Sequence, residues 1–177
     1  MNQTKKSGKM RIYIIGFMGA GKSRFAKNLA SSLSYDFLDL DLEIERSEHK
    51  WISEIFATKG EDYFRKAEQN ALKNTLEKSD VVIACGGGTP VFFDNMEFMN
   101  KNGKTIYLKP DNQIIIDRLN INSRKRPLLK QIRPEEMADY VNKLLKERNL
   151  FYRKAHFVID PQRTQLEQVS KMLIQTS

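Results

Sequence analysis

The chain has 177 residues and a formal net charge of +8, with 40% apolar and 29% charged residues. This length predicts one domain with a full hydrophobic core, and the composition excludes a disordered or collagen-like chain. The single cysteine, Cys85, excludes an intrachain disulfide framework and a zinc site built from several thiolates of one chain. No apolar run is long enough to span a membrane, and we expect a cytoplasmic protein.

The positive charge is concentrated in two segments. Residues 1–11 and residues 118–133 contain basic side chains and no acidic ones. A protein that coats nucleic acid usually spreads its basic residues over a face, so this distribution favours an anionic ligand over a nucleic-acid partner. We expect residues 1–10 to form a flexible tail without a catalytic role.

The chain opens with a strand, a glycine turn and a helix. Residues 11–15 predict a short buried strand, and apolar positions at helical spacing predict a helix over residues 22–34. Between them, residues 16–23 read GFMGAGKS and match the phosphate-loop pattern G-x-x-x-x-G-K-[ST] in the context that it requires. Its backbone N–H groups contact phosphates, Lys22 reaches the β and γ phosphates, and Ser23 ligates Mg²⁺.

Strands and helices alternate along the rest of the chain. This pattern predicts an α/β fold with a mainly parallel sheet covered on both faces, whose ligands bind at the carboxyl ends of the strands. Two stretches interrupt it, namely short helices inserted at 41–60 and the basic stretch 121–133. Further strands are predicted at residues 37–40, 81–84, 105–108 and 157–159, and longer helices at 61–78, 111–120, 134–154 and 164–175.

Two carboxylates, Asp39 and Asp41, close the second predicted strand. Residues two apart in an extended chain point to the same side, so both are expected to face the ligand edge of the sheet. One would serve a metal and the other a substrate hydroxyl. Helix capping is the alternative, because Asp41, Glu43 and Glu45 would begin a following helix, where acidic side chains are favourable.

Three consecutive glycines, residues 86–88, follow the third predicted strand. Such a run has a high conformational entropy cost and indicates backbone lying against a ligand, with a tight turn beneath a neighbouring helix as the alternative. Cys85 is interpreted as small buried packing rather than as a nucleophile, because no histidine is near it in sequence.

Three basic positions are ambiguous when taken singly. Arg65 begins a predicted helix, where pairing with Glu61 or Glu68 is an alternative to ligand binding. Arg148 lies on a long predicted helix and is equally compatible with a solvated face. Residues 124–127 are compatible with a plain basic loop or a weak nucleic-acid patch.

Two aromatic residues and two histidines receive no functional role. Trp51 and Phe56 flank apolar residues at helical spacing and are expected in the core. His49 and His156 are far apart and lack metal-ligand spacing.

Taken together, these segments resemble the shikimate kinases over residues 11 to about 160. The resemblance implies a three-layer α/β/α fold of the P-loop, nucleoside-monophosphate-kinase type with a five-stranded parallel sheet. It implies one domain over residues 1–177, with a substrate-binding insertion at about 41–70 and a lid at about 119–131. The matching segments are GFMGAGKS at 16–23, DLD at 39–41, GEDYFRKAE at 60–68, CGGG at 85–88, RPLL at 126–129 and ERNLFY at 147–152.

The reaction that this resemblance implies is transfer of the ATP γ-phosphoryl group to the 3-hydroxyl of shikimate, in the route to chorismate and the aromatic amino acids. Mg²⁺ would be the cofactor, shikimate and ATP the small-molecule partners, and the protein a monomer without nucleic-acid or membrane partners.

The resemblance also carries over residue roles. Arg65 and Arg148 would clamp the shikimate carboxylate, while Asp41 accepts a ring hydroxyl and takes its proton late. The catalytic set would be Lys22, Asp41 and Arg126. ATP would bind to Gly19, Ala20, Gly21, Lys22, Ser23, Arg24, Arg118 and Arg126, Mg²⁺ to Ser23 and Asp39, and shikimate to Asp41, Arg65, Gly86, Gly87, Gly88 and Arg148.

Two positions depart from common patterns. The strand at residues 81–84 runs into Cys85 rather than ending in the usual aspartate. The family that the chain resembles also lacks this aspartate, and the resemblance implies that Asp39 takes its place at the metal. Arg24 replaces the threonine that often follows the lysine-serine pair. The alternatives are another small-metabolite or nucleotide kinase on the same scaffold, a nucleotide-dependent switch or nucleic-acid-binding module, and an inactive binding protein.

Overall fold

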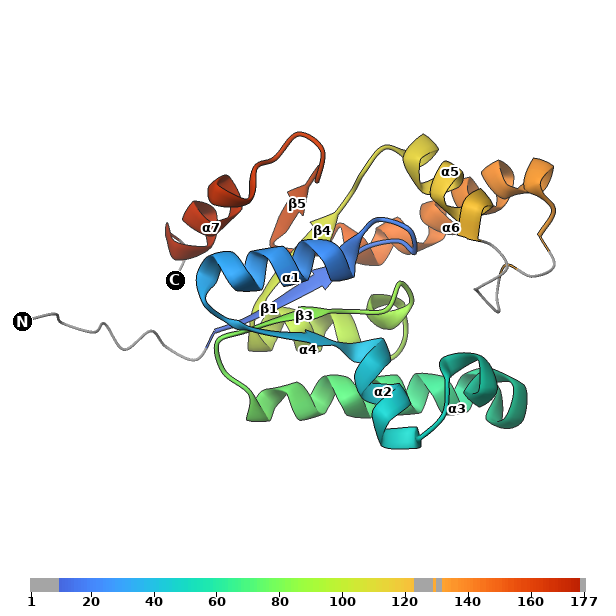
Figure 1. Cartoon of the computed structure of the whole chain (residues 1–177), viewed down its shortest axis with the longest axis horizontal. Helices are drawn as coiled ribbons and strands as arrows, with labels where there is room; N and C mark the ends of the chain where they lie inside the picture. The colour runs from blue at the N-terminus through green and yellow to red at the C-terminus, as the bar shows by residue number, and fades with distance from the viewer. Residues whose placement is uncertain (1–9, 123–128, 130–131, 176–177) are drawn as a thin grey trace, which may run out of the picture.

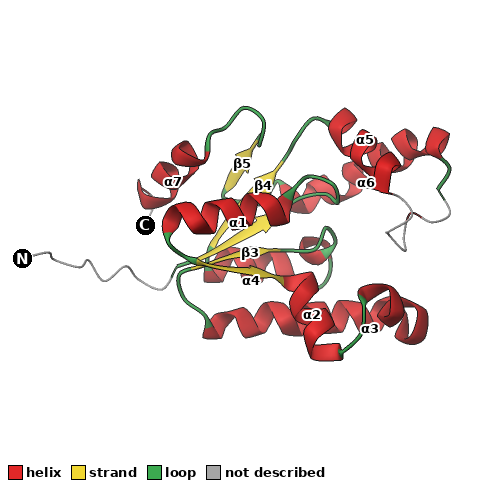
Figure 2. Ribbon diagram, in the orientation of Figure 1, coloured by secondary structure: helices red, strands yellow, loops and turns green. Residues whose placement is uncertain are grey.

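The computed structural model describes residues 10–122, 129 and 132–175. Within them, five parallel strands form one sheet in the order β2-β3-β1-β4-β5 (Figures 1 and 2). This confirms the predicted α/β class and the five-stranded parallel sheet. The strands are β1 Arg11–Ile15, β2 Asp36–Asp39, β3 Val81–Ala84, β4 Lys104–Leu108 and β5 Phe157–Ile159.

Helices connect the strands and cover the sheet on both faces, as the alternation predicted (Figure 2). Three short 3₁₀ turns, at Thr75–Glu77, Thr89–Val91 and Pro134–Glu136, lie among the described residues. The α-helices described are α1 Lys22–Leu33, α2 Leu40–Glu48, α3 Ile52–Asn74, α4 Asn95–Asn102, α5 Asn112–Asn122, α6 Met137–Tyr152 and α7 Leu166–Gln175.

The two faces of the sheet bury separate apolar clusters. Side chains alternate along a strand, so Ile12 and Ile14 of β1 pack with α1 and α7 on one face. Tyr13 and Ile15 pack on the other face, in a cluster that includes residues of α3, α4, α5 and α6. The chain therefore has the predicted three layers.

Helix α4 was not among the predicted helices. Its eight residues read NMEFMNKN, and only Met96 and Met99 of them are buried apolar side chains. Two apolar positions are too few to show a helical period, so contact with the sheet rather than the local pattern stabilises this helix.

A small second core holds α2 against α3. Ile44 of α2 and Ile55 and Phe64 of α3 are buried together, and the Phe56 and Phe64 ring centroids lie 4.7 Å apart. Gly60 interrupts α3 with φ 80° and ψ 175°, a conformation available essentially only to glycine.

Trp51 does not belong to this core, so the core prediction for Trp51 was wrong. Its side chain is 67% exposed, because it occupies the N-cap of α3, where the chain has not yet entered the helix and the helical spacing does not apply. Phe56 is partly buried against the small core, as expected.

Parallel pairing brings the ligand-binding segments to one edge of the sheet. Asp39 of β2 and Ile14 of β1 both pair in register with Ala84 of β3. The loops that follow these three strands therefore meet at the carboxyl edge, where α/β proteins bind ligands. None of the described helices has the length and apolar character to cross a membrane.

Candidate active site

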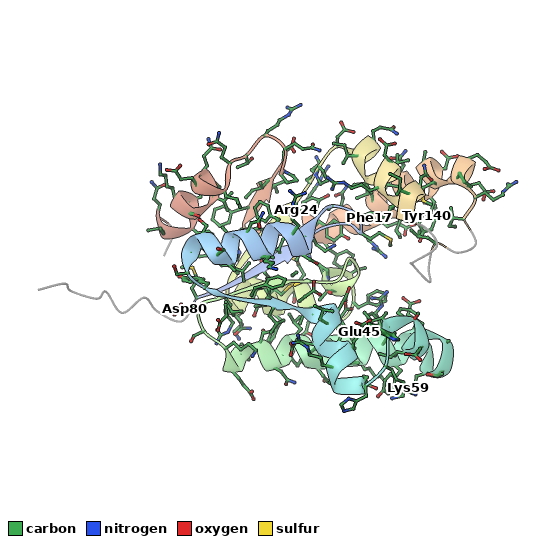
Figure 3. All side chains as sticks on the ribbon, viewed as in Figure 1. Phe17, Arg24, Glu45, Lys59, Asp80 and Tyr140 are labelled. Atoms are coloured by element: carbon green, nitrogen blue, oxygen red, sulfur yellow. The ribbon has the colours of Figure 1, made fainter. Side chains whose placement is uncertain are left out.

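The glycine loop after β1 leads directly into α1. Gly21 is the N-cap of α1 with φ 91°, a left-handed conformation that favours glycine, and the Phe25 N–H donates to its carbonyl at 3.0 Å. The Lys22 Nζ donates to the Phe17 carbonyl at 3.0 Å. Figure 3 shows Phe17 and Arg24 near this end of α1. The loop thus has the form of a phosphate-binding loop at a helix N-terminus.

Ser23, Asp39 and Asp41 form a connected group beside this loop. The Ser23 hydroxyl donates to Asp39 Oδ2 at 2.6 Å, and Asp39 Oδ1 accepts from the Asp41 N–H at 3.1 Å. Asp39 is the N-cap of α2 and Asp41 lies in its first turn. The N-cap is thus Asp39 rather than Asp41, and Asp39 caps α2 while it contacts Ser23.

The larger pocket at this edge has a volume of about 390 Å³. Arg118 lines it, and its Nη1 donates to the Gly19 carbonyl at 2.9 Å. Ala20 is 2% exposed and packs in the core, so only its backbone can contact a ligand. Arg126 lies outside the described residues. The other predicted nucleotide and metal residues that line the pocket are Gly19, Gly21, Lys22, Ser23, Arg24 and Asp39.

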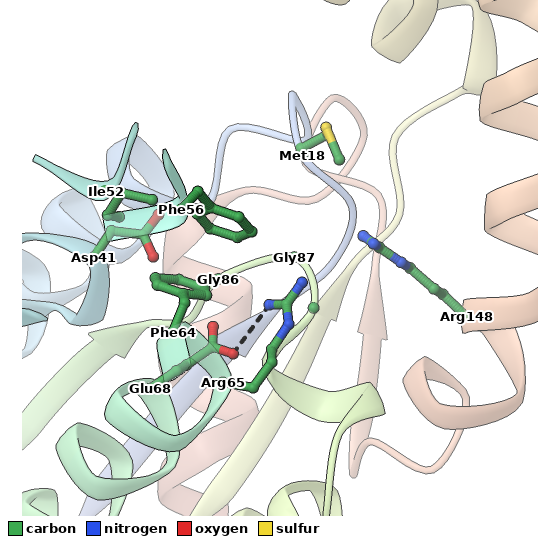
Figure 4. Close-up of a pocket in the computed structure, with 11 residues that line it drawn as sticks. Met18, Asp41, Ile52, Phe56, Phe64, Arg65, Glu68, Gly86, Gly87 and Arg148 are labelled. Carbon is green, nitrogen blue, oxygen red and sulfur yellow. Dashed lines mark hydrogen bonds and ion pairs between the residues drawn. The ribbon is translucent and has the colours of Figure 1, made fainter. Parts of the chain in front are cut away.

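A smaller pocket of about 130 Å³ adjoins the first (Figure 4). Met18, Asp41, Gly86 and Gly87 line both pockets, so a ligand in one would lie next to a ligand in the other. The smaller pocket has an apolar side formed by Met18, Ile52, Phe56 and Phe64 and a polar side formed by Asp41, Arg65, Glu68, Gly86, Gly87, Gly88 and Arg148.

Arg65 is buried and heavily paired. It is 6% exposed, its Nη2 lies 2.7 Å from Glu61 Oε1, and its Nη1 lies 3.2 Å from Glu68 Oε2. The Phe92 ring centroid lies 4.1 Å from the guanidinium carbon. The ion pairs considered from the sequence are therefore present, and Arg65 lines the pocket as well.

Arg148 contrasts with Arg65. It is 7% exposed, and its buried Nη1 has no hydrogen-bond partner among the described residues. Figure 4 shows its side chain reaching toward the pocket from α6. A solvated face is therefore excluded for Arg148. A buried guanidinium N–H without a partner has a high energetic cost, which a bound anion would remove.

The three glycines after β3 leave little room for side chains. A Cβ on Gly88 would lie 2.6 Å from Arg65 Nη1, and one on Gly87 would lie 3.2 Å from the Met18 nitrogen. A Cβ on Gly86 would overlap with Glu68. The run of glycines therefore lets the backbone pass close to the phosphate loop and the two arginines at once.

The carboxylates of the site influence one another. Burial, and then the charges of Asp39 and Glu68, raise the pKa of Asp41 from 3.8 to about 6. Burial also raises the pKa of Glu68, against the lowering effect of its contacts with Thr89 and Arg65. The Thr89 hydroxyl donates to Glu68 Oε1 at 2.5 Å.

Glu68 and the apolar wall were not among the predicted site residues. Glu68 was considered only as a partner for Arg65, and its position three residues later on a helix was the available signal. For Ile52, Phe56 and Phe64 no local signal distinguishes a pocket wall from a core, because both are apolar at helical spacing.

Cys85 is 3% exposed, and burial raises the pKa of its thiol well above the ordinary value, which confirms the packing interpretation. Among the described residues, no group of three or more histidine, cysteine, aspartate or glutamate side chains could hold a metal. Mg²⁺ at kinase sites needs only one or two protein ligands, because phosphates and water supply the rest. The hydroxyl and carboxylate oxygens of Ser23 and Asp39 fit that pattern.

Comparison with known proteins identifies the family. The family model for shikimate kinase matches residues 18–177. A shikimate kinase of Parabacteroides distasonis is 44% identical over 153 residues, covering 86% of this chain and 88% of the relative.

Solved structures agree with this match. The crystal structure of shikimate kinase from Bacteroides thetaiotaomicron has a TM-score of 0.84 and 38% identity, covering 96% of this chain and 98% of that one. The shikimate kinase from Acinetobacter baumannii in complex with shikimate has a TM-score of 0.82 and 32% identity, covering 95% and 92%. The chain therefore belongs to the shikimate kinase family and is an ATP-dependent kinase.

Proposed function

We propose that this protein transfers the γ-phosphoryl group of ATP to the 3-hydroxyl of shikimate, giving shikimate 3-phosphate and ADP. The observation that carries the proposal is the buried, unpartnered Nη1 of Arg148 at a small pocket beside a phosphate loop. Shikimate has a carboxylate, which would accept the hydrogen bond that Nη1 does not make within the protein. The related enzyme of Acinetobacter baumannii has been solved in complex with shikimate.

The larger pocket is assigned to ATP. The backbone of Gly19, Ala20 and Gly21 would contact the phosphates, and Lys22 would leave the Phe17 carbonyl to reach the β and γ phosphates. Arg24 adds positive charge beside them. Arg118 would contact the nucleotide from α5, and Arg126, which lies outside the described residues, is assigned to the nucleotide by the family resemblance alone.

Ser23 and Asp39 would hold Mg²⁺ at the phosphates. When bound there, the ion neutralises charge on the β and γ phosphates and lowers the repulsion toward an incoming hydroxyl oxygen. The 2.6 Å contact from the Ser23 hydroxyl to Asp39 keeps both oxygen ligands on the side of the phosphate loop.

The smaller pocket is assigned to shikimate. Arg148 and Arg65 would bind the carboxylate through paired N–H donors, and the glycines at 86–88 would let the ring approach the backbone. The apolar side at Phe56 and Phe64 would cover the carbon face of the ring. Glu61 and Glu68 hold Arg65 in one orientation, which reduces the entropy lost when the substrate binds.

Asp41 is placed to orient the acceptor hydroxyl, because it lines both pockets. With a pKa of about 6 it is largely ionised at pH 7 and accepts the hydroxyl proton in a hydrogen bond. In a loose transition state this proton moves late, after the bond to the leaving oxygen has weakened.

The test is ADP release measured with shikimate, gluconate, AMP and no acceptor. We expect turnover with shikimate alone, and phosphorus NMR of the product should show the phosphate on the 3-oxygen. If shikimate gives no more ADP than buffer, the proposal is wrong. Preference for gluconate or AMP would instead assign the chain to another kinase on this scaffold.

We further propose that the protein works as a cytoplasmic monomer without nucleic-acid or membrane partners. The excess of basic over acidic residues is concentrated in residues 1–11 and 118–133, which supports the absence of a nucleic-acid partner, because a protein that coats nucleic acid usually spreads its basic residues over a face. Light scattering of the purified protein tests the monomer, and a DNA-binding titration at several salt concentrations tests the absence of a nucleic-acid partner.

A further inference from the structure

Tyr152 lies at the end of α6, four residues after Arg148 and on the same side of the helix. Its side chain is completely buried, and its hydroxyl donates to the Gly87 carbonyl at 2.5 Å. Burial raises the pKa of this hydroxyl above its ordinary value, so it keeps its proton and acts as a donor. Helix α6 therefore contributes charged Arg148 to the acceptor pocket and the neutral Tyr152 hydroxyl to the glycine loop that borders it.

The contact fixes the plane of a peptide that borders the pocket. Because a trans peptide is planar, holding the Gly87 carbonyl toward Tyr152 directs the Gly88 N–H the opposite way. Glycine residues on both sides of this peptide give it little resistance to rotation. The hydroxyl of Tyr152 therefore restricts the rotation of the Gly87–Gly88 peptide, which the two glycines alone would allow.

Gly87 is tightly enclosed at the same point. A Cβ there would lie 3.2 Å from the Met18 nitrogen, 3.4 Å from Arg148 Nη1 and 3.6 Å from the Gly16 carbonyl oxygen. A rotated Gly87 peptide would change the space between the phosphate loop and Arg148. We infer that Tyr152 is a positioning residue, whose hydroxyl orients the Gly87–Gly88 peptide for acceptor binding.

The ring and the hydroxyl of Tyr152 have separable roles. The ring packs against Tyr107, with centroids 4.9 Å apart and planes at 41°, and belongs to the core of its sheet face. Phenylalanine would keep that packing and lose the hydroxyl, with its hydrogen bond to Gly87 and its interaction with Arg148. Tyr107 provides a matched control, because its hydroxyl donates to Asn149 Oδ1 at 2.8 Å instead of to the glycine loop.

The inference rests on the proposed acceptor site and is tested by steady-state kinetics of the full chain with shikimate and ATP. For Tyr152→Phe we expect the KM for shikimate to rise about tenfold, because the substrate must then order the loop itself. The KM for ATP should stay within about twofold of wild type, and so should both constants for Tyr107→Phe. Thermal unfolding of the two variants measures the purely structural effect of each hydroxyl.

Spectra of protein labelled with ¹⁵N-glycine add a readout that does not depend on turnover. Loss of the Tyr152 hydroxyl should move the amide signals of Gly87 and Gly88, while loss of the Tyr107 hydroxyl should leave them in place. The inference is overturned if Tyr152→Phe keeps the wild-type KM for shikimate, if both variants raise it equally, or if Tyr152→Phe does not fold. Absence of shikimate turnover in the wild-type protein would instead contradict the proposed function.

Discussion

Arg65 and Arg148 line the same pocket but differ in how their guanidinium nitrogens are paired. Glu61 and Glu68 pair with Arg65 at 2.7 and 3.2 Å, whereas Nη1 of Arg148 has no hydrogen-bond partner within the described part of the chain. A bound anion gains more from this Nη1, because its N–H would not have to give up a protein acceptor to bind the ligand. We therefore propose Arg148 as the principal anchor for a substrate carboxylate and Arg65 as a preorganised second contact.

Replacing Arg148 with lysine tests this assignment. Lysine keeps the charge and loses the planar pair of donors, so we expect kcat/KM for shikimate to fall about a hundredfold. The KM for ATP should be unchanged. Arg153→Lys is the control, since Arg153 is exposed at the end of the same helix. A loss below about threefold in Arg148→Lys would remove Arg148 from the anchor role.

Asp41→Asn tests the acceptor orientation. The amide keeps the size of the carboxylate but cannot take the hydroxyl proton, so we expect phosphoryl transfer to be abolished while ATP binding stays nearly intact. Calorimetric titration with ATP and the coupled assay measure the two effects separately. Asp62→Asn, at an exposed position on α3, should behave like wild type. Substantial turnover by Asp41→Asn would contradict the role of Asp41.

The raised pKa of Asp41 makes both activity and stability depend on pH. The value of about 6 predicts that kcat/KM for shikimate falls as the pH drops below about 6, where Asp41 becomes protonated. In the unfolded chain the ordinary value is 3.8, so the folded protein binds this proton more tightly. Ionisation of Asp41 therefore destabilises the fold progressively as the pH rises from about 4 through 6.

It follows that Asp41→Asn should be more stable than wild type at pH 8, by at most about 3 kcal/mol. The difference should shrink as the pH falls and vanish below about pH 4, where wild-type Asp41 is also neutral. Urea unfolding at pH 8, 6 and 4 measures it. An unchanged or lowered stability of the variant at pH 8 would show that Asp41 is not held in an unfavourable charged state.

Ser23→Ala tests the metal site. Removing the hydroxyl takes away the 2.6 Å hydrogen bond to Asp39 and one of the two protein oxygens proposed to bind Mg²⁺. We therefore expect the Mg²⁺ concentration needed for half-maximal activity to rise at least about tenfold. Chelation of divalent ions should abolish wild-type activity. Ser32→Ala removes an exposed hydroxyl on the opposite end of α1 and should leave the Mg²⁺ dependence unchanged. Equal Mg²⁺ dependence in all three proteins would exclude Ser23 as a ligand.

Gly88→Ala tests the need for a bare backbone at the pocket. The added Cβ would lie 2.6 Å from Arg65 Nη1, so Arg65 or the loop must move. We expect the KM for shikimate to rise about tenfold or more, with the KM for ATP serving as the internal reference. An unaltered KM for shikimate would mean that the position of Arg65 does not matter for acceptor binding.

Local patterns in the sequence were sufficient for the strands and the phosphate loop. A short apolar run, three glycines and a lysine-serine pair determine a strand, a turn and a helix start through interactions within a few residues. The run at Gly86–Gly88 likewise indicated backbone beside a ligand, because its entropy cost demands a reason. The parallel sheet followed from the alternation of strands and helices.

Tertiary contacts decided what residues distant in sequence do together. Helix α4 is stabilised by burial of Met96 and Met99 against the sheet, and Trp51 is exposed because α3 begins beside it. Helical spacing in the sequence already suggested that Arg65 pairs with Glu61 or Glu68, whereas only the tertiary structure shows that Arg148 is buried, with its Nη1 lacking a hydrogen-bond partner among the described residues. Motif chemistry and ion pairs within one helix are local, whereas burial depends on which elements pack together and thereby decides which polar groups are left without a partner.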